Sequence, residues 1–565
     1  MTQMTRIHAP YALQAVAGAM ALWCGLAAAV EIELDNPDLK IRWDNTVRYN
    51  LGARMEKQDP RILASPSYDE SDAKFAKGKI VTDRLDLLSE VDVRYKSDFG
   101  VRVVGAAWYD NAYDNHTVTS PAAGGAIPTS YYNNTYSGNV SRYVNGPSAE
   151  FLDAFVWGNM NLGDIPVNLK VGRHTIVWGE GLLIGGQAIS YSQAPVDGVK
   201  AVASPGIETK EVFLPLNQVS FKAQVTNDLT IAGQYFLQWE PTRVPNGGTY
   251  LMGADTSPYV DQLGAAPGFA IARTSPYEPG KTGNWGLSAR LNVGAIDSTV
   301  GLYYRKFNDY NPETGIQFLG TTPQAPGPFR FVYARDESLI GLSLARSIGP
   351  VSFGSELSYR RNTTLNSKTT YNFLQDTGAR GDTLHAVVNG VYLMPKTVLW
   401  DTGSIIGELA YSHLSKVTAN PTLFRGVGYA GCIKSGTGAG GVPAQAGDIS
   451  DACSTRDFVQ AAVNFTPQYL AVLPSWDLDL PMSINYGLHG TAPTGGGGFN
   501  KLMTWSVGAK MTFNQRHEFS LRYSDLSVPT KYNAAGTAAI GGNALGSSVG
   551  ATDRGWIVFT YKTSI

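Results

Sequence analysis

The sequence has little charge and few cysteines. Only 16% of its 565 residues are Asp, Glu, Lys or Arg, against about 25% in a typical soluble domain. Its formal charge of −2 comes from 45 basic and 47 acidic residues that are mixed along the chain, which indicates neither a nucleic-acid surface nor an acidic tail. After residue 29, no apolar run approaches the roughly 18 residues that a membrane-spanning helix needs. The mean hydropathy of −0.13 likewise argues against a helical membrane protein.

Glycine and tyrosine are abundant instead, with 62 and 29 residues, and several segments alternate apolar and polar side chains. In 85–95, for example, leucines and valines alternate with Asp86, Glu90 and Asp92, and 216–226, 351–360 and 503–513 follow the same pattern. Such alternation over about ten residues is typical of a transmembrane β-strand. A soluble β-sandwich also alternates, but long strands that end in Tyr or Trp favour a membrane barrel.

The connections between the expected strands alternate between long and short, as in bacterial barrels with short periplasmic turns. The predicted fold class is therefore all-β: a transmembrane up-and-down antiparallel β-barrel of about 18 strands (roughly 16–20), with both termini in the periplasm. The expected strands are 41–54, 83–96, 100–113, 149–162, 165–178, 214–227, 229–242, 284–294, 297–309, 336–347, 351–365, 384–395, 404–418, 457–470, 476–490, 503–514, 517–530 and 553–565.

The two ends of the sequence fit an exported barrel. Residues 1–29 combine Arg6, an apolar stretch over 11–26 and three alanines at 27–29, the pattern of a cleaved signal peptide. An uncleaved anchor helix is the alternative. Residues 30–565 then form the barrel, and 553–565 resembles the terminal strand that barrel-assembly machinery recognises. Pairing of this strand with 41–54 would remove the free sheet edges.

Removal of the signal peptide leaves Cys432 and Cys453 as the only cysteines. Two cysteines 21 residues apart in an exported protein predict a disulfide, with two free thiols as the alternative. No histidine lies close to either cysteine, and HExxH and CxxC motifs are absent. The sequence therefore predicts no metal site, no cofactor and no enzymatic activity.

One stretch carries a family pattern. Residues 169–180 read LKVGRHTIVWGE, followed by PVD at 195–197 and PGIETKE at 205–211. This resembles the Gram-negative outer-membrane β-barrel family known as domain of unknown function 1302. Members are often encoded beside a companion outer-membrane protein and a resistance-nodulation-division type transporter. The resemblance implies movement of hydrophobic small molecules or lipids across the envelope.

The same stretch is unusual for a membrane strand, because the alternation that turns Val171 outward would also turn Arg173 outward. A lipid-facing charge near mid-bilayer costs about 2–4 kcal/mol, so we expect a bulge near Gly172 or a position at the outer rim. We expect 179–213 to fold into the lumen as a gate, with Lys210 or Arg173 pairing Glu180 or Glu211; a solvated surface loop is the alternative. The gate candidates are Arg173, His174, Trp178, Glu180, Lys200, Glu208, Lys210 and Glu211.

The polar faces of the expected strands predict the lumen lining. Both signs of charge occur there, which argues against a strongly ion-selective pore. In 149–162, Phe151, Phe155 and Trp157 share a face with Asp153, and the pattern leaves open whether that face meets the lumen or lipid. The predicted lining includes Arg84, Asp86, Glu90, Asp92, Arg94, Arg102, Asp153, Lys222, Glu356, Arg360, Glu408 and Lys510.

These features predict a passive channel in the cell outer membrane, surrounded by lipid, for hydrophobic or amphipathic small molecules or lipids. Its partners would be a small hydrophobic ligand and, as the family resemblance implies, periplasmic and inner-membrane transport proteins; no nucleic acid is expected. A general diffusion porin is one alternative. A surface adhesin or receptor that uses the long outer loops is another.

Overall fold

The computed structural model describes residues 30–32, 35–320, 327–368, 370–371, 377–432 and 447–565. The predicted signal peptide, residues 1–29, lies outside these residues. None of the helices in the described part of the chain combines the length and apolarity that a membrane crossing requires.

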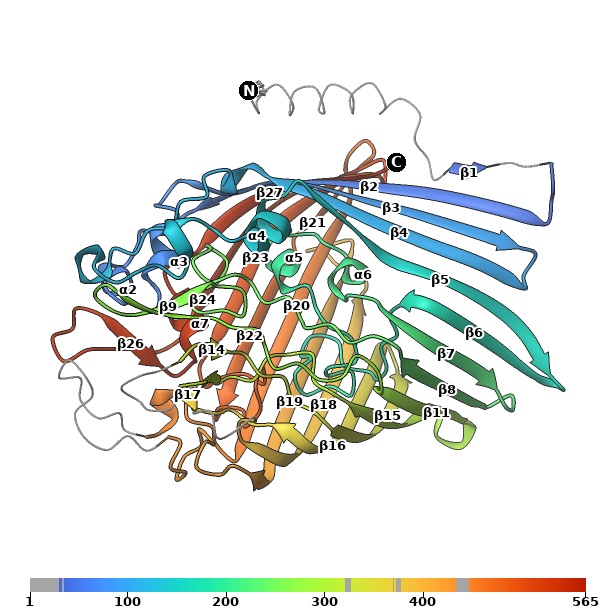
Figure 1. Cartoon of the computed structure of the whole chain (residues 1–565). Helices are drawn as coiled ribbons and strands as arrows, with labels where there is room; N and C mark the ends of the chain where they lie inside the picture. The colour runs from blue at the N-terminus through green and yellow to red at the C-terminus, as the bar shows by residue number, and fades with distance from the viewer. Residues whose placement is uncertain (1–29, 33–34, 321–326, 369, 372–376, 433–446) are drawn as a thin grey trace, which may run out of the picture.

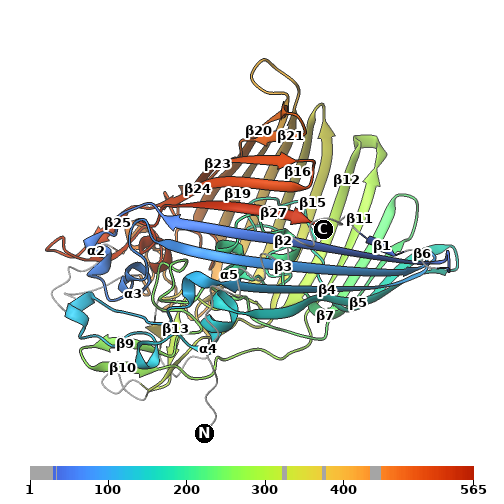
Figure 2. The same ribbon diagram turned by 90° about the horizontal axis from the view of Figure 1, so that it is seen from above.

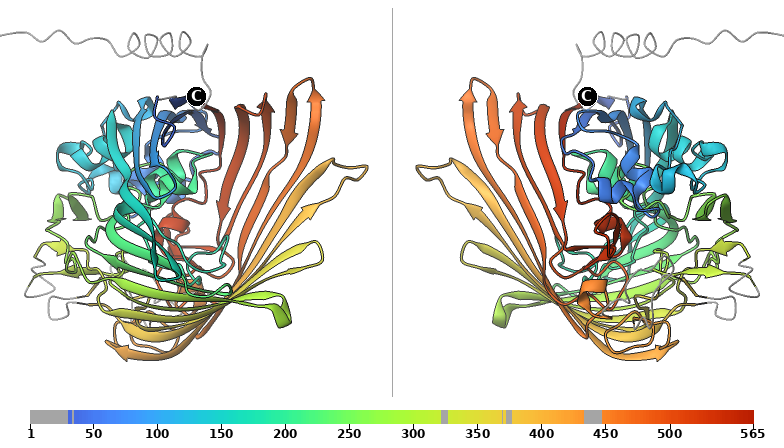
Figure 3. Two further views of the ribbon diagram at one scale, coloured as in Figure 1. Left: turned by 90° about the vertical axis from the view of Figure 1, so that its right-hand side faces the viewer. Right: turned by 90° about the vertical axis from the view of Figure 1, so that its left-hand side faces the viewer.

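The described strands include one closed antiparallel ring (Figure 1). Each strand pairs with its neighbour along the chain, and the ring closes where β2 pairs with β27 from Thr46↔Ser564 to Arg54↔Trp556. Figure 3 shows this junction, with blue and red strands side by side. The predicted fold class and the predicted closure are confirmed.

The ring has 18 strand positions among the described residues, one of them shared by β21 and β22, which Leu480 and Pro481 separate. Proline cannot donate a ladder hydrogen bond, which accounts for the interruption. A short strand, β1 (Val30–Ile32), also pairs with β2. In chain order the ring comprises β2 (Leu39–Arg54), β3 (Ile80–Tyr95), β4 (Phe99–Asp110), β5 (Ser148–Leu162), β6 (Ile165–His174), β7 (Leu216–Gln224), β8 (Leu229–Phe236), β11 (Trp285–Val293), β12 (Ser298–Phe307), β15 (Glu337–Ile348), β16 (Val351–Thr364), β18 (Arg380–Met394), β19 (Thr402–Ala419), β20 (Asp457–Leu473), β21 (Trp476–Asp479), β22 (Met482–His489), β23 (Met503–Phe513), β24 (His517–Ser527) and β27 (Trp556–Ser564).

The two faces of the ring differ as the alternation predicts. Leu87, Leu342 and Leu521 are exposed on the outside, whereas Arg84 and Glu356 are buried on the inside. At the end with short turns, the ring centroids of Trp476 and Phe513 lie 4.9 Å apart and those of Phe519 and Tyr561 lie 5.0 Å apart. Aromatic side chains of this kind form the interfacial girdles of membrane barrels.

The long connections form a structured cap at the other end, which Figures 1 and 2 show beyond the strands. Its core includes Tyr113, Tyr131, Tyr136 and Phe329. Three small sheets lie outside the ring, so 310–335 adds no barrel strand. The cap elements are α2 (Pro60–Leu63), α3 (Asp69–Ala73), α4 (Gly138–Val140), α7 (Gly546–Val549), the pair β9 (Gln262–Ala266) and β10 (Phe269–Ala272), the sheet of β13 (Ile316–Phe318), β14 (Phe329–Arg330) and β17 (Thr370–Tyr371), and the pair β25 (Thr530–Tyr532) and β26 (Ala539–Gly542).

Candidate functional site: a constriction inside the barrel

The chain turns into the ring after β6 and returns to the wall at β7. We call residues 175–215 the luminal segment; it carries α5 (Gly198–Ala203) and α6 (Thr209–Val212), which lie among the barrel strands in Figure 1. Because the chain leaves the wall here, β6 and β8 end at His174 and Phe236 instead of at 178 and 242. The segment's polar contacts below are made to the inward faces of strands around the ring.

Two carboxylates hold the first half of the segment through its backbone. Glu356 on β16 accepts hydrogen bonds from the amides of Glu180, Gly181 at 2.8 Å and Ile189 at 2.7 Å. Glu408 on β19 accepts from three successive amides, those of Leu182 at 2.6 Å, Leu183 at 2.9 Å and Ile184 at 2.5 Å. Charged acceptors make stronger hydrogen bonds than neutral ones, so the apolar residues 181–184 are held through their backbone amides.

Two arginines bind the carbonyl groups of the same half. Arg360 on β16 donates to the carbonyls of Gly186 at 2.9 Å and Ala188 at 2.8 Å. Arg305 on β12 donates to the carbonyls of Ile189 at 2.9 Å, Tyr191 at 2.7 Å and Ser192 at 2.5 Å. Both guanidinium groups are buried, and the backbone of 186–192 supplies the acceptors that a buried cation requires.

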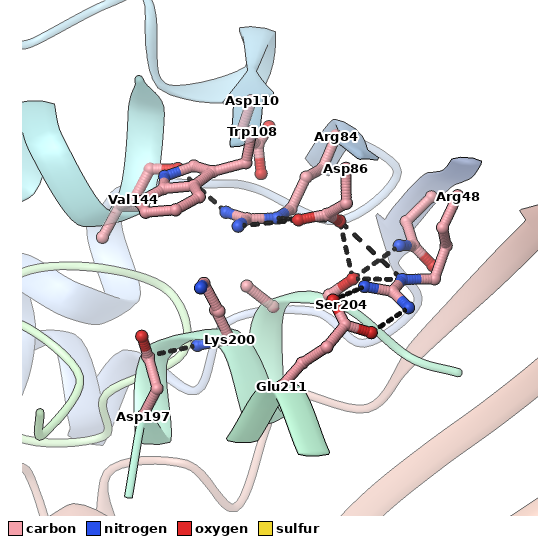
Figure 4. A network of polar contacts seen from close by, with 12 residues as sticks. Arg48, Arg84, Asp86, Trp108, Asp110, Val144, Asp197, Lys200, Ser204 and Glu211 are labelled. Carbon is pink, nitrogen blue, oxygen red and sulfur yellow. Dashed lines mark hydrogen bonds and ion pairs between the residues drawn. The ribbon is translucent and has the colours of Figure 1, made fainter. Parts of the chain in front are cut away.

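The second half is fixed through side chains (Figure 4). Arg48 on β2 donates twice to Glu211, at 3.0 and 3.1 Å, and its Nε donates to Ser204 Oγ at 2.9 Å. Ser204 Oγ in turn donates to Asp86 on β3 at 2.7 Å. Lys200 Nζ lies 2.5 Å from Glu150 on β5. These contacts attach α5 and α6 to the blue side of the ring.

A further cluster joins α6 to the strands on both sides of the barrel closure. Lys210 Nζ lies 2.5 Å from Glu90 on β3 and 3.0 Å from Glu208, and Lys562 on β27 lies 2.9 Å from the other oxygen of Glu208. Burial opposes ionisation of Glu208, but hydrogen bonds from Lys562 and Lys210 outweigh it and lower the pKa of Glu208 to about 2. The Glu208 carboxylate therefore stays ionised throughout the physiological pH range.

The predicted pairing among the gate candidates is wrong. Glu211 pairs with Arg48, Glu180 pairs with Arg290 at 3.0 Å, and Arg173 lies 4.0 Å from Glu240. Glu180, Lys210 and Glu211 each pair instead with a strand residue, on β11, β3 and β2 respectively. No bulge occurs at Gly172, because the β5–β6 register runs without a shift to Arg173, which sits at the outer end of its strand.

The two remaining gate candidates lie at the point where the chain leaves β6. His174 Nε2 lies 2.7 Å from Ser220 Oγ, and its ring lies 5.4 Å from that of Phe155. The Trp178 amide donates to the side chain of Gln193 at 2.9 Å, and its ring packs toward Tyr303 at 6.2 Å. Both are packing and positioning residues of the site.

A β-bulge divides the aromatic face of β5. The register with β4 shifts between Val103 and Gly105, so β5 carries one extra residue and its inward side changes parity. Phe151 is 68% exposed on the outside, whereas Phe155 turns inward, with Lys170 Nζ 5.3 Å from its ring centroid. Asp153 also turns inward and contacts Arg102 at 3.4 Å.

The predicted lining residues differ in how they are used. Arg84 and Asp86 form a buried pair at 3.0 Å, Arg102 bridges Glu90 and Asp92, and Lys510 pairs with Asp479 at 2.9 Å. Lys222 and Arg94 are exposed, and no ion pair involves either of them within the described ranges. The partners of the segment that escaped the sequence analysis include Arg48, Glu150, Asn389 and Lys562. The alternation of 41–54, which places Arg48 on the polar face, could have identified the first.

The cap holds a separate group of buried carboxyls. Asp69, Glu70 and Asp255 are buried together, with the Asp255 oxygens accepting from the amides of Glu70 at 3.3 Å and Ser71 at 2.9 Å. Burial and the charge of Asp69 raise the pKa of Asp255 to about 7. The predicted disulfide between Cys432 and Cys453 is present, with Cα atoms 6.0 Å apart.

A family model described as "Protein of unknown function (DUF1302)" matches residues 11–565. The chain belongs to this family. No curated protein matches it. The family assignment agrees with the resemblance that 169–211 carries.

Several solved porin structures share a low similarity with this member of the family. OccK2 of Pseudomonas aeruginosa, in complex with glucuronate, is 10% identical, with 93% of this chain and 98% of that chain covered and a TM-score of 0.39. A BenF-like porin from Pseudomonas fluorescens Pf-5 is 10% identical over 93% and 99%, with a TM-score of 0.39. OccAB1 of Acinetobacter baumannii is 10% identical over 93% and 96%, with a TM-score of 0.41. Similarity at this level of identity and TM-score carries no information about the function of this chain.

Proposed function

We propose that the protein is an outer-membrane channel whose luminal segment is its gate. The supporting observation is that one segment within a closed ring is held by inward residues of β2, β3, β5, β16, β19 and β27. A ring of this size encloses an aqueous interior, and its apolar outer face matches a lipid environment.

The cargo that we propose is a hydrophobic or amphipathic small molecule. Phe155 turns an aromatic face inward beside Lys170, and Leu182 and Val177 on the luminal segment are about half exposed. Such apolar surface within a polar lumen suits a solute with an apolar part. Transport would be passive, and the family resemblance supports periplasmic and inner-membrane partners. The long outer loops pack into a structured cap, and this arrangement supports the adhesin alternative less than the channel.

Planar-bilayer conductance with liposome swelling tests this function. The purified protein in lipid should conduct ions at low open probability and admit sugars slowly, because the segment occupies the lumen. Removal of residues 180–212, with the flanking residues joined by a short Gly/Ser linker, should give a large steady conductance and rapid sugar entry. Absence of conductance in both forms would reject the channel, and rapid sugar entry in the intact protein would favour a general diffusion porin.

A further inference from the structure

A cavity of about 530 Å³ lies inside the barrel at its short-turn end, below the luminal segment. Glu180 and Leu182 of the segment line it, together with Asn292 on β11 and Asn389 on β18. Its volume falls within the range of small-molecule sites, roughly 300–1,000 Å³.

The ion pair of Glu180 lies at the edge of this cavity, because Glu180 lines the cavity and its partner Arg290 does not. Glu180 Oε1 lies 3.0 Å from Arg290 Nη2, and the Arg290 side chain is 45% exposed. The Arg48–Glu211 pair, by contrast, is almost fully buried. Exposed pairs contribute only about 0–1 kcal/mol, so a carboxylate from solution can replace that of Glu180 at low cost.

The surroundings of Arg290 combine polar and apolar contacts. Leu182 is 51% exposed, and Val391, which shares the inward face of β18 with Asn389, lines the same cavity. The Asn292 side-chain oxygen accepts from Thr299 at 2.9 Å, which orients its NH₂ group as a donor. A ligand here would meet a cation and an amide at one part and aliphatic carbon at another.

We propose that this cavity binds an amphipathic monocarboxylate, whose carboxylate takes the place of Glu180 on Arg290 while its apolar part lies against Leu182. The Glu180 carboxylate occupies the anion position of the empty site. Release of its side chain leaves the Glu180 backbone held by Glu356 and by Asn389, which donates to the Glu180 carbonyl at 2.6 Å. The proposal rests on the channel function and assigns a cargo class to it.

Binding of octanoate to the full protein in nanodiscs tests the site, with empty nanodiscs as the blank and saturation-transfer NMR as the readout. Loss of a hydrogen bond to a charged group should make Arg290→Gln bind octanoate about ten- to a hundredfold more weakly, with octan-1-ol binding unchanged. Glu180→Gln should bind octanoate more tightly than the wild type, because the competing charge is gone. Arg42→Gln, a cation at the same end of the barrel on the opposite wall, is the control.

Three results would overturn the proposal: octanoate binding that survives Arg290→Gln, weaker binding by Glu180→Gln, or an equal loss in Arg42→Gln. Bilayer conductance of the same variants separates this question from the channel function. Variants that conduct without binding octanoate specifically would reject the carboxylate site alone, whereas a protein that never conducts would reject the function on which the site rests.

Discussion

Replacement of Arg48 by methionine should release the second half of the luminal segment. Arg48 makes two hydrogen bonds to Glu211 and one to Ser204, and its Nε lies 3.9 Å from Asp86. Methionine fills a similar volume but donates nothing. The Glu211 carboxylate would then be buried without its cation, which should weaken the attachment of the segment to the ring.

The size of the effect follows from the burial of the pair. Both side chains are at most 3% exposed, and removal of one partner of a buried ion pair costs about 3–5 kcal/mol. At 1.36 kcal/mol per decade, the population of the released segment should rise by about two to four powers of ten. Replacing both Arg48 and Glu211 by methionine should restore most of this loss, because paired apolar residues leave no buried charge.

Hydrogen exchange of the 198–212 amides measures the effect, and single-channel recordings should show a parallel rise in open probability. Lys306→Met, which removes an exposed pair with Asp336 at 3.3 Å, is the matched control, with a change within about 1 kcal/mol. Unchanged exchange in Arg48→Met would refute the reasoning. A double variant as open as the single one would show that the ion pair is not the cause.

Four further outcomes are expected. Glu408→Gln should free the amides of 182–184 and make this stretch protease-sensitive, since a hydrogen bond to a neutral acceptor is about half as strong as one to a carboxylate. Unchanged cleavage would contradict the role of Glu408 in holding this stretch. Because the pKa of Glu208 is lowered to about 2, its stabilisation of the segment should be full above about pH 4.3 and lost toward pH 2, and Glu208→Gln should reduce this acid step in conductance. Because the pKa of Asp255 is raised to about 7, its stabilisation of the cap is full below about pH 3.9 and is lost as pH rises through 7; Asp255→Asn should reduce the fall in protease resistance of the cap between pH 4 and 7. Cys453→Ser should lower the resistance of the 420–456 connection to protease, with an upper estimate of about 3 kcal/mol, while heat stability of the barrel stays the same.

The strand positions could be predicted from the sequence because each depends on local alternation. Leu87 and Asp86 face opposite sides whatever the rest of the chain does, and every expected strand has a counterpart in the ring. The β5 face could not be decided, because a single extra residue before Ala154 exchanges the two sides. Periodicity does not reveal a bulge that non-local pairing creates.

The candidate site was only partly predictable. The GRxxxxWGE pattern and the apolar character of 179–213 indicated an inward segment, and Glu356, Arg360 and Glu408 were expected in the lumen. Their partners were not predictable, since Glu408 binds backbone amides 224–226 residues away. The cap carboxyls also escaped notice, because the proximity of Asp69 and Asp255 depends on two loops packing together.

The sequence alone determined a barrel, its strands, the lipid-facing and lumen-facing sides of most of them, and the disulfide. These features follow from the two-residue period of a strand and from spacing along the chain, which neighbouring residues fix. Only the tertiary structure decided which charges meet: Arg48 with Glu211, Arg290 with Glu180, Lys562 with Glu208. Closing the ring brings the two ends of the chain and the luminal segment within hydrogen-bond distance, and separation in sequence carries no record of that proximity.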